Sequence, residues 1–109
     1  MSEENSTPTP PRFFFLRLIP PRPTFAHDMT AEERSVMQQH VGYWTRHLQQ
    51  GTAIVFGPVA DPAGPYGLGI VRVADETAIG AFITNDPAIC GRIGCRYEVF
   101  PMLRATVRD

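Results

Sequence analysis

The segment TAIVFGPVADPAGPYGLGIVRVA, residues 52–74, decides the fold that we expect for this chain. Two runs rich in β-branched and other apolar residues, 52–59 and 67–74, flank ADPAGPY, a stretch rich in proline and glycine. This pattern is typical of two strands joined by a hairpin loop. The segment therefore predicts an antiparallel hairpin and places Asp61 in its loop, where aspartate is common for backbone reasons alone.

Upstream of the hairpin, the sequence predicts a strand, a connector and a long helix. Bulky apolar residues in RFFFLRLIP, residues 12–20, favour a strand. The prolines of PPRPTFAHDM, residues 20–29, indicate an extended connector without regular structure. Thr30 and Glu33 then form a Thr-x-x-Glu capping box, and Gly51 is the expected C-terminal glycine, so the helix lies between them.

Downstream of the hairpin, a second helix and a last strand are expected. Asp75 is a suitable cap for a helix over 76–84, and Asn85-Asp86-Pro87 ends it. Residues 89–94 are expected to be loop or one irregular turn, and CRYEVFPML, residues 95–103, the last strand. The order β-α-β-β-α-β predicts an α+β, ferredoxin-like fold with a four-stranded antiparallel sheet.

The length of 109 residues allows one domain, which we place at residues 12–109. Residues 1–11 are acidic and proline-rich, unlike a signal peptide, and are expected to be a disordered leader. The net charge of −1 and the scattered basic residues favour neither nucleic acid nor an acidic membrane as a partner. The apolar run FFFLRLI is too short to span a bilayer and contains Arg17.

The two cysteines, Cys90 and Cys95, have neither the spacing of a redox CxxC motif nor a usual zinc spacing. We expect them to be reduced thiols without a metal role. In a chain without an export signal, this expectation favours the cytoplasm as the location.

The predicted strands are apolar on both faces. Phe13 to Leu16 and Ile54 to Phe56 are consecutive apolar residues, whereas a sheet with one solvated face alternates apolar and polar residues. Two helices in a chain of this size cover only one face. We therefore predict a homodimer in which the uncovered faces of two sheets pack together.

A helical wheel of the long helix predicts one core stripe, formed by Met37, Val41, Trp44 and Leu48. His40 falls at the border of this stripe, beside Trp44, and His47 is expected to be exposed. A half-buried histidine with a satisfied hydrogen bond is the simplest interpretation of His40, and a catalytic role is the alternative.

Four motifs in order resemble the YCII-related (YciI-like) proteins of the dimeric α+β barrel superfamily: HVGYWTRHLQQG (40–51), VFGPVADPAG (55–64), NDPAI (85–89) and YEVFPM (97–102). The resemblance covers Phe13 to Met102. It implies a ferredoxin-like subunit whose sheet packs against that of a partner. It also implies a small-molecule enzyme with a His–Asp pair, which corresponds here to His40 and Asp61.

A carboxylate that accepts from one imidazole nitrogen fixes the tautomer and leaves the other nitrogen basic. A His40–Asp61 dyad would therefore suit proton transfer or water activation in an isomerase, lyase or hydrolase, without a metal or cofactor. The contact requires Gly57-Pro58 to bend the chain back, since a straight strand carries Asp61 roughly 15 Å past His40.

The substrate is expected to be a small molecule held between the first helix and the sheet. Arg17 or Arg22 is a candidate for holding an anionic group, and Tyr43 or Tyr66 for donating a hydroxyl. Trp44 and Phe56 are candidates for the pocket wall. Asp86 is either an assisting group or a helix cap. A non-catalytic module that binds a small ligand in the same pocket is the second hypothesis.

Overall fold

The structure is a computed structural model that describes residues 10–108, so the predicted leader at 1–11 lies almost entirely outside the described residues. The elements are β1 (Arg12–Ile19), α1 (Phe25–Asp28), α2 (Ala31–Gln50), β2 (Ala53–Val59), β3 (Tyr66–Val73), α3 (Glu76–Thr84), α4 (Pro87–Cys90) and β4 (Arg96–Pro101). The predicted α+β, ferredoxin-like order is confirmed, with α1 and α4 as additional short helices. No helix within 10–108 has the length and apolar character that crossing a membrane requires.

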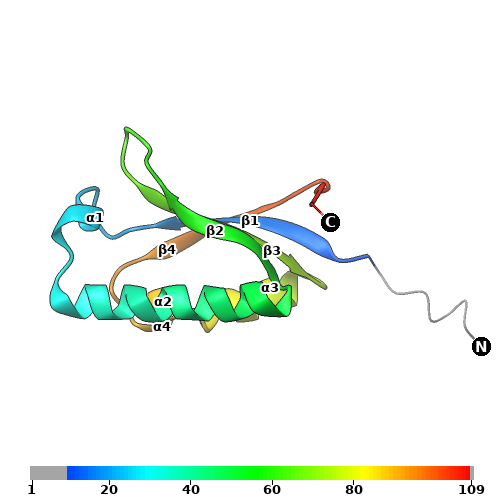
Figure 1. Cartoon of the computed structure of the whole chain (residues 1–109), viewed down its shortest axis with the longest axis horizontal. Helices are drawn as coiled ribbons and strands as arrows, with labels where there is room; N and C mark the ends of the chain where they lie inside the picture. Colours follow the sequence, from blue (N-terminus) through cyan, green and yellow to red (C-terminus); the bar gives the residue numbers. More distant parts are fainter. Residues whose placement is uncertain (1–9, 109) are drawn as a thin grey trace, which may run out of the picture.

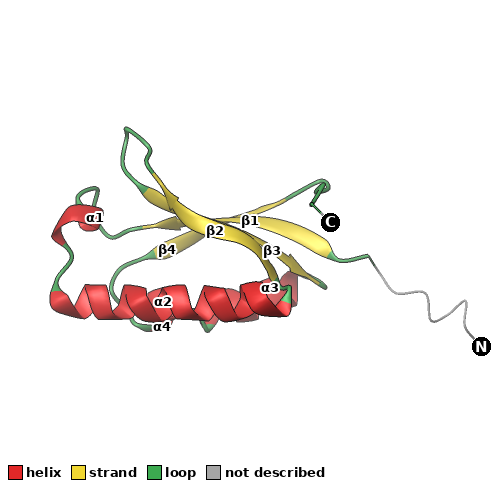
Figure 2. Cartoon of the chain, in the orientation of Figure 1, coloured by secondary structure: helices red, strands yellow, loops and turns green. Residues whose placement is uncertain are grey.

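The four strands form one antiparallel sheet in the order β2-β3-β1-β4. The hairpin expected at 52–74 is present, and it joins β2 to β3. In Figures 1 and 2, α2, α3 and α4 lie together on one side of this sheet. The tip of the β2–β3 hairpin projects beyond the end of the sheet. The molecule therefore has one sheet layer and one helix layer.

Helix α2 begins and ends as its sequence predicts. The Thr30 side chain accepts from the Glu33 amide, and the Glu33 carboxylate accepts from the Thr30 amide, which completes the capping box. Gly51 ends the helix in the left-handed conformation at φ 88°. These local signals fix the position of α2 along the chain.

The connector before α2 is not extended, and this part of the sequence-based prediction was wrong. Phe25–Asp28 form a helical turn, α1, which buries Phe25 against the core side of the molecule. The prolines all precede this turn, where they do not remove a helical hydrogen bond. Arg22 donates to both Asp28 and Glu33, and these ion pairs tie α1 to the start of α2.

The face of α2 that is buried differs from the predicted stripe. Trp44 is buried as expected, but Val41 is 49% exposed and Leu48 43% exposed. His40 is buried instead, and His47 is half-buried against the ring of Phe82 rather than exposed. The helix is turned in this way because it packs on α3 and α4 as well as on the sheet.

The core lies between α2, α3 and the sheet, and its buried members are Phe14, Leu16, Trp44, Ala53, Val71, Ile79 and Phe82. Trp44 passes directly over the backbone of β3 at Gly69. A Cβ built at Gly69 would lie 2.2 Å from Trp44 Cη2, so this position accepts only glycine while the indole stays in place. The indole is thereby fixed next to the site described below.

The other face of the sheet carries apolar side chains without a covering helix. Residues of β1 alternate, so Phe14, Leu16 and Leu18 face the helices, and Phe13, Phe15 and Arg17 face away. On this open face the rings of Phe15 and Phe100 stack with centroids 5.4 Å apart. The two-sided apolar character expected of the strands is therefore present.

Candidate functional site

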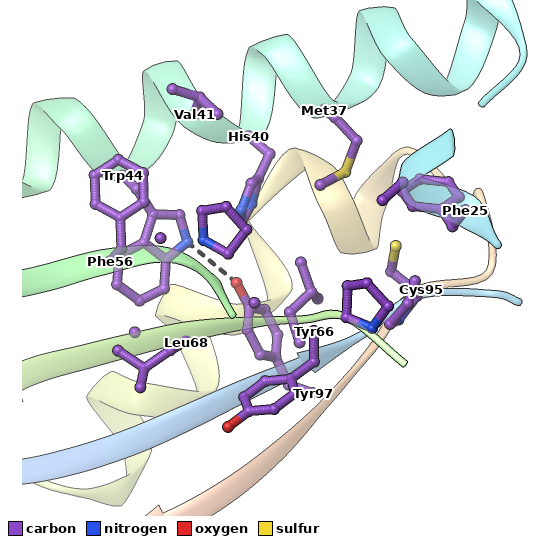
Figure 3. Close-up of a pocket in the computed structure, with 18 of the residues that line it drawn as sticks. Phe25, Met37, His40, Val41, Trp44, Phe56, Tyr66, Leu68, Cys95 and Tyr97 are labelled. Atoms are coloured by element: carbon purple, nitrogen blue, oxygen red, sulfur yellow. Dashed lines mark hydrogen bonds between the residues drawn. The ribbon is translucent and has the colours of Figure 1, made fainter. Parts of the chain in front are cut away.

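A pocket of about 230 Å³ opens between α2, α1 and the helix-facing side of the sheet. Its wall is mostly apolar and comprises Leu18, Pro20, Phe25, Ala26, Met29, Met37, His40, Val41, Trp44, Phe56, Gly57, Pro58, Pro65, Tyr66, Gly67, Leu68, Gly69, Cys95 and Tyr97. Figure 3 shows His40 pointing from α2 into this space, between Met37 and Trp44. His40 is therefore placed where a bound molecule would meet it.

His40 is hydrogen-bonded to Asp86, the residue that precedes α4. Its Nδ1 lies 2.9 Å from Asp86 Oδ1 and 3.1 Å from Oδ2. The histidine is 8% exposed, and Asp86 is completely buried. The pair is thus a buried His–Asp dyad that joins α2 to the loop between α3 and α4.

Asp86 accepts from several other groups as well. Its Oδ1 accepts from the Ala88 amide at 2.9 Å, which makes it the N-cap of α4. Its Oδ2 accepts from Trp44 Nε1 at 2.9 Å and from the Tyr97 hydroxyl at 2.5 Å. Burial acts to raise the pKa of Asp86. The hydrogen bond and charge interaction with His40, together with the hydrogen bonds from Tyr97 and Ala88, outweigh it and hold the pKa below its usual value.

The donors around Asp86 hold one another in place. Trp44 Nε1 also lies 3.1 Å from the Tyr97 hydroxyl, the contact drawn as a dashed line in Figure 3. Burial, with the negative charge of Asp86, raises the pKa of Tyr97, so its hydroxyl keeps its proton and donates it. The carboxylate is therefore ionised and saturated with donors on both oxygens.

The tautomer of His40 follows from this arrangement. An ionised carboxylate only accepts hydrogen bonds, so the ring nitrogen facing Asp86, Nδ1, carries a proton. In the neutral ring, Nε2 is then an acceptor. Among residues 10–108, Nε2 has no hydrogen-bond partner, and it is not one of the fully buried unpaired nitrogens, so it is free to meet a bound molecule.

The family model for the YCII-related domain matches residues 13–103. The chain belongs to the YCII-related family. Among solved structures, this YCII-related chain is similar to the uncharacterized protein TM1266 from Thermotoga maritima. The TM-score is 0.50 and the sequence identity 16%, over 84% of this chain and 98% of that one. At this sequence identity, the similarity between the two structures concerns the fold alone. No curated protein matches the sequence of this chain.

The expected hydrogen bond between His40 and Asp61 is not made in this YCII-related domain, and that prediction was wrong. Gly57 and Pro58 do not bend the chain: they continue β2 as an edge strand, paired with Leu68 and Gly67 of β3. Asp61 follows at the tip of the hairpin, where its side chain accepts from the Ala63 amide 2.8 Å away. It therefore has the turn role that its Asp-Pro context allows.

The other candidate residues of the YCII-related domain divide by position. Trp44 and Phe56 line the pocket, and their rings pack 5.6 Å apart. Arg17 projects from the open face of the sheet, over the ring of Tyr66, and does not line the pocket. Tyr43 also lies outside it, because its hydroxyl donates to the Phe82 carbonyl on the α3 side. The predictions that Arg17 and Tyr43 face a molecule in this pocket were therefore wrong.

Two residues of this site were missed from the sequence, Tyr97 and Cys95. Side chains alternate between the two faces along β4, and Tyr97 lies on the helix-facing side, opposite Leu18 of β1. The same alternation in the sequence RYEVFP could have predicted this position. Cys95 lines the pocket just before β4, and burial raises the pKa of its thiol to about 11. Its thiol is therefore uncharged at neutral pH.

Proposed function

We propose that this protein is a small-molecule enzyme in which His40 transfers a proton at Nε2 and Asp86 orients it. The observation that carries the proposal is the buried hydrogen bond from His40 Nδ1 to Asp86, at the wall of an apolar pocket. A histidine held in this tautomer presents a basic nitrogen to a bound molecule. Asp86 takes the place that the sequence had suggested for Asp61.

The dyad supports proton abstraction next to a carbonyl, or activation of a water at a carbonyl or lactone. In both cases Nε2 accepts the proton, and the imidazolium that forms is stabilised by the ionised Asp86. Trp44, Tyr97 and Ala88 fix the carboxylate, so the imidazole is oriented before a substrate arrives. Positioned acid–base groups of this kind contribute roughly 10²–10⁴-fold to a rate.

A non-catalytic module that binds a small ligand is the second candidate. It is favoured by the scarcity of free polar groups at the pocket, since the Tyr97 hydroxyl is already committed to Asp86. Such a protein would use Nε2 only as a hydrogen-bond acceptor. The two candidates differ in whether the loss of Nε2 removes turnover or only affinity.

A test uses α-angelica lactone, a neutral single-ring lactone with an acidic CH₂ group, as the probe. Deuterium uptake in D₂O reports proton abstraction, and ring opening reports activation of water. His40→Asn keeps a donor near Nδ1 and removes Nε2, so we expect it to lower either rate by about 10²-fold or more. His27→Gln is the matched control, because His27 is exposed on α1 and does not line the pocket. Saturable binding of the probe without acceleration over buffer would favour the binding module.

We also propose that two copies of the chain associate through their open sheet faces. Support comes from the uncovered apolar side chains of that face, including the stacked Phe15 and Phe100. Phe100→Glu should reduce the molar mass in solution from two chains to one, since it would bury an unpaired charge at the interface. Leu103→Glu, at an exposed position just after β4, should not. A wild-type molar mass of one chain would contradict the homodimer.

A further inference from the structure

We infer that the pocket selects a neutral molecule with a single ring, which donates an O–H, N–H or polarised C–H to His40 Nε2. The inference deepens the proposed function and rests on it, because it takes His40 as the group that meets the substrate. It is carried by the size of the pocket, by the charge of its wall, and by the hydrogen-bonding state of its polar groups.

The size of the pocket matches one ring with small substituents. An apolar cavity of about 150 Å³ is large enough for benzene. The pocket here has about 230 Å³, and the difference corresponds to two or three water-sized groups. Its floor is the backbone of β3 at Gly67 and Gly69, flanked by the flat rings of Trp44 and Phe56. The two rings pack on each other and offer a flat apolar surface to one side of a planar ring.

The charge of the wall argues against an anionic ligand. The residues that line the pocket include neither lysine nor arginine, and all of them are described. The carboxylate of Asp86, hydrogen-bonded to His40 at the wall, is negative. A carboxylate in the pocket would lose its hydration without gaining a cationic partner from the wall, and it would be repelled by Asp86.

The polar groups of the wall define what the ligand must supply. The Tyr97 hydroxyl is committed to Asp86, so it is not free to donate to a ligand. In its neutral form, His40 offers a lone pair at Nε2, with its proton on Nδ1. The Cys95 thiol is uncharged at neutral pH and is only a weak donor and acceptor. The strongest available partner in the pocket is therefore an acceptor, and it is matched by a donor on the ligand.

A competing possibility is an anion held by Arg17. A second cavity of about 260 Å³ shares Pro20, Pro65 and Tyr66 with the first. Arg17 and Arg22 line it, but Arg22 is already paired with Asp28 and Glu33. Arg17 Nε is buried without a partner, but its NH1 lies 3.9 Å from Glu98 and its guanidinium covers the Tyr66 ring. Arg17 faces the open side of the sheet, whereas His40 lies on the helix side. The geometry therefore favours a ligand that does not need Arg17.

The test compares three ring compounds of similar size on the full chain, by chemical-shift titration. Phenol is neutral with a donor, anisole is neutral without one, and benzoate is anionic. We expect phenol to bind at least tenfold more tightly than either of the others, with the largest shifts at Met37, Val41 and Trp44. His40→Asn should reduce phenol affinity to that of anisole, and His27→Gln should leave it unchanged.

Equal affinity for phenol and anisole, or tighter binding of benzoate, would overturn the inference. The outcome is separable from that of the proposed function. If phenol binds as expected but α-angelica lactone is not turned over, the enzyme proposal fails and the ligand class stands. If α-angelica lactone is turned over through His40 but benzoate binds more tightly than phenol, the ligand class fails and the enzyme proposal stands.

Discussion

Replacing Asp86 by asparagine is expected to be the most damaging isosteric change in the molecule. Asp86 is fully buried and accepts from His40, Trp44, Tyr97 and the Ala88 amide. Asparagine keeps the shape but has one acceptor oxygen and an NH₂ group that only donates. If its oxygen stays on the His40 and Ala88 side, the NH₂ group faces the Trp44 indole N–H, and one buried donor is left without a partner.

The magnitude follows from these contacts. Hydrogen bonds to a charged acceptor contribute about 1.5–3 kcal/mol each, and an unsatisfied buried donor costs about 1–3 kcal/mol. Allowing for rotation of the Tyr97 hydroxyl, we expect Asp86→Asn to lower the free energy of unfolding by about 3–5 kcal/mol, the range seen when one member of a buried charged pair is removed. With a urea dependence of about 1.5 kcal/mol per M, the midpoint falls by about 2–3 M.

Urea unfolding at one fixed protein concentration measures this loss. Trp44 is the only tryptophan and donates to Asp86, so its fluorescence reports on the site itself, and far-ultraviolet circular dichroism reports on the whole fold. The control is Asp61→Asn, because an asparagine carbonyl can still accept from the Ala63 amide in the turn. We expect a change below about 0.5 kcal/mol for the control. A loss below about 1 kcal/mol for Asp86→Asn, or equal losses for both variants, would show that the buried contacts of Asp86 do not stabilise the fold as described.

Two further predictions concern packing and alkaline pH. In urea unfolding, Gly69→Ala should lower the free energy of unfolding by about 3 kcal/mol, because the added Cβ would overlap Trp44. The control Gly80→Ala, in the open middle of α3, should raise it by up to about 1 kcal/mol. Burial raises the pKa of Tyr97, and also that of Cys95 to about 11, so the folded state favours their protonated forms. The stability that the two protonated groups contribute is complete below their unfolded pKa values and is lost as pH rises above about 9. The urea midpoint should therefore fall from pH 8 through pH 9 to pH 10, and a midpoint that does not change with pH would contradict this.

The elements that the sequence predicts correctly are those with local causes. The capping box of α2, the glycine at its end and the proline-rich hairpin loop each act within a few residues, so the order of strands and helices was readable. The rotation of α2 was not readable, because it depends on how the helix rests on α3 and α4. Val41 and Leu48 are exposed for that reason, although their spacing matches a buried stripe.

The choice of carboxylate partner for His40 shows where a single sequence stops being informative. Asp61 and Asp86 both precede proline, and both cap a local turn or helix. Which of them meets His40 depends on whether β2 bends at Gly57-Pro58, and an edge strand accommodates proline without bending. The donors from Trp44 and Tyr97 that saturate Asp86 come from elements far apart in the chain.

In the proposed site, His40 donates from Nδ1 to Asp86 and presents a free Nε2 to the pocket. The tautomer of the His40 ring, observed through long-range ¹H–¹⁵N correlations of ¹⁵N-labelled protein, tests this most directly. His40→Asn identifies its signals among those of the three histidines. With the ring neutral, we expect the proton on Nδ1 and an unprotonated Nε2. A proton on Nε2 in the neutral ring would contradict the claim.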